Sequence, residues 1–153
     1  MDKNIKVKNV IVKTAADFFM PIALIFGLYV ILHGHLSPGG GFQGGVIVAA
    51  AVVLVYLGYG HETTENVFNE NLLKKSETFA AIMYAGFAFL GIFYGANFCR
   101  NVLADKMGAA GELFSSGTIF WMNFSVGFKV LTGIGFLSLI FFGLLKEKNN
   151  ESK

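Results

Sequence analysis

The sequence predicts an all-α integral membrane protein with four transmembrane helices. Of its 153 residues, 54% are hydrophobic and 14% are charged, whereas soluble domains carry about 25% charged residues. The apolar residues form four runs, at about 10–32, 41–60, 79–98 and 119–145, each close to the roughly 20 residues that cross a bilayer core. We therefore expect one membrane domain over residues 1–153. No small-residue cleavage site follows the first run, so we expect it to be a retained span.

The first span is expected to contain a break. Pro21 lacks an amide hydrogen and its ring crowds the carbonyl four residues earlier, so a kink would free the carbonyl of Asp17. Two interpretations of Asp17 stay open. Its carboxylate could hold a cation or a proton beside the free carbonyl, or it could be solvated at the interface, which is the commoner case.

A hairpin rich in glycine joins the first and second spans. Ser37 can cap the second helix and Pro38 can occupy its first position. Glycines four residues apart let another helix backbone approach closely, although the same loop could instead expose amides and carbonyls to a water-filled path. The other residues that we assign to the hairpin or to helix packing are Gly39, Gly40, Gly41, Gln43, Gly44 and Gly45.

His33 and His35 are candidates for an ion path within this hairpin. Histidines at the edge of the hydrocarbon are functional candidates by default, and imidazole titrates near neutral pH. On a regular helix the two side chains would point about 200° apart. The sequence has no Cys, Asp or Glu near them, so we expect no metal site. Haem is poorly supported because His61 lies at the opposite end of the second span. The alternative is that the histidines only anchor the hairpin.

The fourth span contains one charged residue, Lys129, far from its ends. A lysine near the bilayer midplane costs about 2.5–3.5 kcal/mol on insertion scales. We therefore expect Lys129 to be buried against protein or water and paired with a carboxylate that could come from outside this chain, and Asn123 and Ser125 could hydrate it. The alternative is an ammonium that snorkels to the interface, but only sixteen residues would then remain between Val130 and Leu145, short of the usual span.

The distribution of lysine and arginine predicts the topology. Nine of these residues fall in the two tails and the second connection, and two fall on the other side of the spans. By the positive-inside rule both termini are cytoplasmic and the hairpin faces outward. The first group is Lys3, Lys6, Lys8, Lys13, Lys74, Lys75, Lys146, Lys148 and Lys153, and the second is Arg100 and Lys106.

The single cysteine limits the chemistry of the chain. Cys99 alone excludes an internal disulfide, a four-thiolate zinc site and an iron–sulfur cluster held by this chain. We therefore expect no cofactor, no metal and no catalytic residue in the chain itself. The weak net charge of +2 does not suggest nucleic-acid binding.

Two segments carry a resemblance to a known family. Residues 33–45 read His-Gly-His-Leu-Ser-Pro-Gly-Gly-Gly-Phe-Gln-Gly-Gly and resemble the Gly-His-x-(Ser/Thr)-Pro-Gly-Gly-Gly-Phe-x-Gly-Gly signature of the MnhB family, the B-type subunits of Mrp-type multisubunit Na⁺/H⁺ antiporters. Residues 123–130 are similar to the Asn-x-x-Val-Gly-x-(Glu/Lys)-Val segment of that family. Chain size and four spans agree with this family.

The resemblance implies a multi-pass protein of a prokaryotic cytoplasmic membrane that works beside other Mrp-type subunits and membrane lipids and is not catalytic on its own. It would contribute to the ion path and to assembly. His33, His35 and the glycine hairpin would form an outward-facing hydrated path or its packing wall, tuned by Lys129, with Asp17 as a weaker candidate at the cytoplasmic end. Two alternatives stay open: the same protein in a ferredoxin-linked hydrogenase or sulfur-reducing complex that couples electron transfer to Na⁺/H⁺ transport, with redox subunits as partners, or a purely structural assembly protein.

Overall fold

The computed structural model describes residues 3–36, 40–104 and 112–151, and these contain helices but no strand. Four of the helices are long and apolar enough to cross a membrane, which confirms the predicted number of spans. The elements are α1 (Lys3–His33), α2 (Gly41–Tyr59), α3 (His61–Val67), α4 (Glu70–Phe93) and α5 (Thr118–Glu151).

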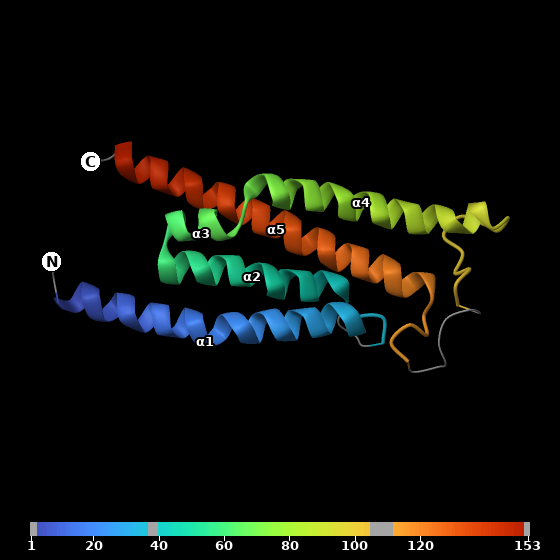
Figure 1. Cartoon of the computed structure of the whole chain (residues 1–153), viewed down its shortest axis with the longest axis horizontal. Helices are drawn as coiled ribbons and strands as arrows, with labels where there is room; N and C mark the ends of the chain where they lie inside the picture. Colours follow the sequence, from blue (N-terminus) through green and yellow to red (C-terminus); the bar gives the residue numbers. More distant parts are fainter. Residues whose placement is uncertain (1–2, 37–39, 105–111, 152–153) are drawn as a thin grey trace.

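The long helices lie side by side in the order α1, α2, α5, α4 (Figure 1). α2 packs between α1 and α5, and α4 packs on α5. Within an 18-residue apolar stretch of each span, 44% of the α2 residues are buried, against 17% in each of the other three helices. α2 is therefore the centre of the fold, and α1 and α4 each expose a wide face. The start of α1 and the end of α5 lie at the same end of the bundle (Figure 1), as an even number of spans requires.

Glycines allow α2 to approach both neighbours. A Cβ atom on Gly44 would lie 2.7 Å from the backbone nitrogen of Ile31 in α1, and one on Gly45 would lie 2.6 Å from the carbonyl oxygen of Gly127 in α5. Real Cβ atoms essentially never come this close to a neighbour, so the helices meet backbone to backbone here. Of the predicted capping and packing residues, Ser37, Pro38 and Gly39 lie outside the described residues.

The third span differs from its predicted position. The helix begins at Glu70 instead of 79 and ends at Phe93 instead of 98. It starts earlier because the Asn69 side chain accepts hydrogen bonds from two amides of the first turn, at 3.0 and 3.2 Å. It ends earlier because the chain turns at Gly95, whose φ is +71°, and folds back so that residues 97–100 lie against Gly91. Gly95 thus permits the turn, and Gly91 leaves room for the returning chain.

A second asparagine fixes the start of α5. The Asn101 side chain donates to the carbonyl of Ser116 at 2.9 Å and accepts from the amide of Thr118 at 2.8 Å. It thereby satisfies one of the first amides of α5, which have no partner within the helix. The connection between α2 and α4 contains α3, whose buried Thr64 hydroxyl donates to the carbonyl of Gly60 at 2.8 Å.

We predict that Gly41→Ala lowers the thermal stability of the protein in detergent, because the added methyl group would overlap the backbone oxygen of Asn123. Overpacking of this kind typically costs about 1–3 kcal/mol. The matched control is Gly86→Ala in α4, where a Cβ atom meets nothing within 4 Å. Equal unfolding temperatures for the two variants would contradict the close contact between α2 and α5.

Candidate functional site

The side chain of Asn123 joins three helices at the hairpin. Its Oδ1 atom accepts a hydrogen bond from the amide of Gly41 at 2.7 Å, and its Nδ2 atom donates to the carbonyl of Ile31 at 2.9 Å. These two backbone groups belong to the end of α1 and the start of α2, where helices leave such groups without intrahelical partners. In a membrane each unsatisfied group costs several kcal/mol. Asn123 therefore holds α1 and α2 together from α5.

The hairpin glycines face protein at this junction. Gly41, Gly44 and Gly45 are buried, and the Gly40 amide donates to the Gln43 side chain at 2.7 Å. A Cβ atom on Gly34 would lie 2.8 Å from the Asn123 side chain. The backbone amides at the start of α2 thus donate hydrogen bonds to two amide side chains, those of Gln43 and Asn123. Neighbouring residues pack closely over this helix end.

The two histidines have different surroundings. Nδ1 of His33 lies 3.2 Å from the Tyr29 carbonyl, and the His33 ring stacks on the Tyr29 ring at a centroid distance of 4.3 Å. The His35 ring meets Phe120 of α5 edge-on at 5.1 Å. Both ring nitrogens of His35 are buried without a hydrogen-bond partner among the described residues. The histidines therefore do not converge on one ligand, and the described residues contain no group of three potential metal ligands.

Lys129 has a carboxylate partner within the chain. Its Nζ atom donates to Oε1 of Glu77 in α4 at 2.9 Å, and the two side chains are 47% and 32% exposed. The carboxylate partner therefore comes from this chain, and within the isolated chain the Lys129 side chain is half-exposed. Sequence reasoning missed Glu77 because it assigned the residue to a loop. Its position two residues before the third apolar run could have indicated that Glu77 belongs to the helix.

Asn123 and Ser125 do not hydrate Lys129 as expected. Six residues of helix rotate Asn123 about 120° away from Lys129, and its amide is committed to the hairpin. The buried hydroxyl of Ser125 donates to the Trp121 carbonyl at 2.8 Å. Asn123, Ser125 and Lys129 of α5 therefore form hydrogen bonds with different partners.

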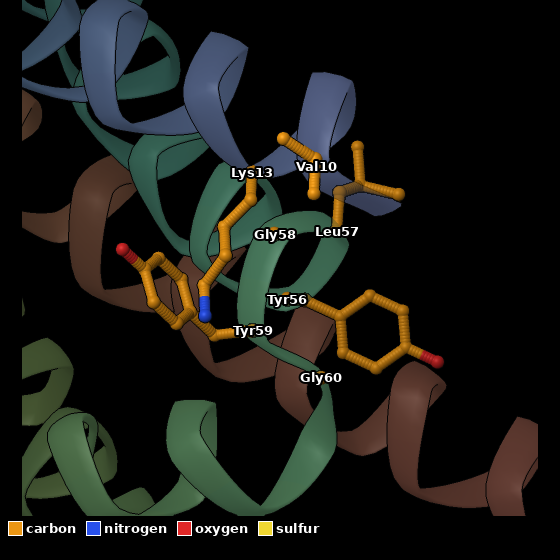
Figure 2. Close-up of a pocket in the computed structure, with 7 residues that line it drawn as sticks. All are labelled: Val10, Lys13, Tyr56, Leu57, Gly58, Tyr59 and Gly60. Carbon is orange, nitrogen blue, oxygen red and sulfur yellow. The ribbon is translucent and has the colours of Figure 1, made fainter. Parts of the chain in front are cut away.

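Asp17 lies in a third polar cluster, about halfway along α1 and beside the end of α2. Its Oδ1 atom accepts a hydrogen bond from the Tyr59 hydroxyl at 2.5 Å, and the Lys13 ammonium lies 4.4 Å from the centre of the Tyr59 ring. Figure 2 shows Lys13 extending from α1 toward this ring, while Tyr56 points away from it. Pro21 lies inside α1, which continues through it. Sequence reasoning missed Tyr59, although an aromatic residue at a span end is typical of the interface.

An open cavity adjoins this cluster. Its volume is about 520 Å³, and Lys13 is the one charged residue among the described residues that line it. The lining consists of Val10, Lys13, Tyr56, Leu57, Gly58, Tyr59 and Gly60 (Figure 2).

The comparison with known proteins identifies the family. A model described as "Domain related to MnhB subunit of Na+/H+ antiporter" matches residues 11–136. The chain belongs to this MnhB family. The match includes the hairpin, Asn123 and Lys129.

Three relatives are similar to parts of the MnhB-family chain. An uncharacterized protein of Methanocaldococcus jannaschii is 32% identical over 81% of this chain and 48% of its own length. The B-type subunit of the Na⁺/H⁺ antiporter of Bacillus subtilis is 34% identical over 63% of this chain and 66% of its own length. The B-type subunit of the Na⁺/H⁺ antiporter of Alkalihalophilus pseudofirmus is 42% identical over 37% of this chain and 40% of its own length. The chain thus spans less than two thirds of the length of each of these relatives.

The candidate residues of this MnhB-family chain lie in three separate places. Asp17 and His33 are sixteen residues apart on α1, about 24 Å along its axis, and Lys129 faces α4. The arrangement therefore provides one hydrogen-bonded hairpin, one ion pair and one tyrosine–carboxylate contact, and does not assemble a single catalytic centre from them.

We predict that Asn123→Ala destabilises the chain by about 2–6 kcal/mol, because it leaves the Ile31 carbonyl and the Gly41 amide unpaired at about 1–3 kcal/mol each. Thermal unfolding in detergent measures the loss. Asn66→Ala is the control, since Asn66 is exposed on α3 and its truncation should change stability little. An Asn123 variant as stable as this control would show that the amide does not hold the hairpin.

Proposed function

We propose that this chain is the B-type membrane subunit of a multisubunit Na⁺/H⁺ antiporter and acts within a complex of Mrp-type subunits. The observation that carries the proposal is the family match over residues 11–136, which includes the hairpin. The relatives that are named as B-type subunits of Na⁺/H⁺ antiporters support it. In this proposal the complex lies in a prokaryotic cytoplasmic membrane, with both chain termini on the cytoplasmic side.

Within the complex, the hairpin acts as a packing wall beside the ion path. The buried glycines and the two hydrogen bonds of Asn123 support a wall, because they leave the ends of α1 and α2 satisfied and tightly covered. His35 is the hairpin residue best suited to exchange a proton with a neighbouring group of the complex, because its ring nitrogens have no hydrogen-bond partner among the described residues.

Asp17 and Lys129 have different parts in this proposal. The Asp17 carboxylate, exposed and bonded to Tyr59, lies at the cytoplasmic end of the path. Lys129 with Glu77 forms a pair of opposite charges inside the span, and such groups in membrane proteins typically mark ion pathways or subunit contacts.

We predict that His35→Ala lowers Na⁺/H⁺ exchange severalfold while leaving the complex assembled, because it removes a titratable group from a ring contact and no hydrogen bond. Everted vesicles from an antiporter-deficient host that expresses the whole complex allow exchange to be followed with a pH-sensitive dye after Na⁺ addition. His35→Phe preserves the aromatic contact with Phe120 and separates packing from titration. Wild-type exchange by both variants would remove His35 from the path.

Deletion of the chain tests the proposal itself. Exchange that persists at the full rate without the chain would refute it. Proteins purified with the tagged chain distinguish the host complex: antiporter subunits alone indicate an exchanger, whereas iron–sulfur and nickel or sulfur-reducing subunits indicate that electron transfer drives the same module.

A further inference from the structure

We infer that the exposed face around the Glu77–Lys129 ion pair, on α4 and α5, is the docking surface for a membrane helix of another subunit that presents a carboxylate to the Lys129 ammonium. The inference rests on the proposed function, because it requires a partner subunit. It adds which face meets that partner and which chemical group makes the contact.

Lys129 lies deep in the apolar part of α5. It is eleven residues after Thr118 and sixteen before Leu145, the ends of that part. At 1.5 Å per residue these lengths are about 16 and 24 Å, and the hydrocarbon core is about 30 Å thick. Glu77 reaches Lys129 from two turns inside α4, two residues before the apolar run of that helix. The ammonium is therefore far from both ends of its own span.

The chain alone leaves this pair incompletely satisfied. The side chains of Lys129 and Glu77 remain 47% and 32% exposed at the surface of α4 and α5. An ammonium group has three donors, and the described residues supply one acceptor, Oε1 of Glu77, at 2.9 Å. Acyl chains supply none. A half-exposed ion pair at this depth is thus costly against lipid and favourable against a polar protein surface.

The part of α1 after Pro21 presents a different, apolar face. On α1, the exposed residues Ile22, Ile25 and Phe26 are 48%, 71% and 54% accessible, and all three are apolar side chains that suit acyl chains. The contrast makes the α4–α5 face, and not the wide face of α1, the surface that needs a protein neighbour.

The shape and chemistry of the face select the partner group. A shallow hollow of about 280 Å³ is lined by Ala81, Tyr84, Ser125, Val126 and Lys129. The small residues Ala81 and Ser125 allow a helix to approach closely. Lys129 lines the hollow and Glu77 does not, so an incoming side chain meets a cation first. A carboxylate complements that charge and accepts hydrogen bonds from the ammonium.

Photo-cross-linking in the intact complex tests the surface. A photo-reactive phenylalanine analogue replaces Tyr84 in the hollow or, as a matched control, Phe26 on α1, and the products are identified by mass spectrometry. We expect a cross-link from position 84 to a carboxylate-bearing helix of another subunit and much less from position 26. Products from position 84 that contain only lipid, or only a second copy of this chain, would overturn the inference.

A charge exchange tests the chemistry. The double variant Glu77→Lys, Lys129→Glu retains an ion pair inside the chain but presents a carboxylate to the hollow. We expect it, like Lys129→Met, to reduce co-purification of the partner at least tenfold while the chain stays at its normal level in the membrane. Glu77→Gln, which leaves the ammonium in place, should reduce it less. Normal co-purification of the double variant would mean that the pair only joins α4 to α5, and would refute docking through Lys129.

A wrong function and a wrong docking surface give different results in these experiments. If no other subunit co-purifies with the unmodified chain, the proposed function itself is wrong. If subunits co-purify but cross-link from position 26 and not from position 84, the function stands and the docking surface is wrong.

Discussion

The arrangement of α1, α2 and α5 depends on one side-chain amide, that of Asn123. A short hairpin leaves the last carbonyls of one helix and the first amides of the next close together, where lipid cannot satisfy them. One amide group contains both the acceptor that Gly41 requires and the donor that Ile31 requires. A carboxylate would supply only the acceptor, and an apolar side chain would supply neither. Asn101 repeats this dual use at the start of α5.

The hydrogen bonds and the glycines of the hairpin depend on each other. The Asn123 side chain is short, so α5 must come almost into backbone contact with α2 before its amide can reach Gly41. Gly45 and Gly127 permit that approach, because a Cβ atom on Gly45 would lie 2.6 Å from the Gly127 oxygen. In return, the hydrogen bonds supply an attraction that apolar contacts between helices do not supply in lipid. This coupling explains why the most glycine-rich segment and the bridging asparagine occur together.

Local features of the chain were predictable from the sequence, and long-range contacts were not. Four spans follow from hydropathy, and the helix-starting glycines follow from their spacing. The position of α4 was missed because its start depends on the Asn69 cap, which hydropathy does not detect. Lys129 was recognisable as the charged residue of the fourth span, but its partner Glu77 lies 52 positions away, and only the packing of α4 on α5 brings them together. Asn123 was assigned to Lys129 because it is near in sequence, although helix rotation separates them.

That rotation also separates the two polar features of α5. Asn123 and Gly127 lie about 40° apart around the helix and face the hairpin, whereas Lys129 lies about 120° from Asn123 and about 9 Å further along the axis. α5 therefore packs against α2 with one face and pairs with Glu77 of α4 on another. Because a helix is stiff over two turns, a neighbour that moves α5 at Lys129 also moves the Asn123 amide relative to Gly41 and Ile31. The ion pair and the hairpin are thus chemically independent but mechanically linked through a single helix.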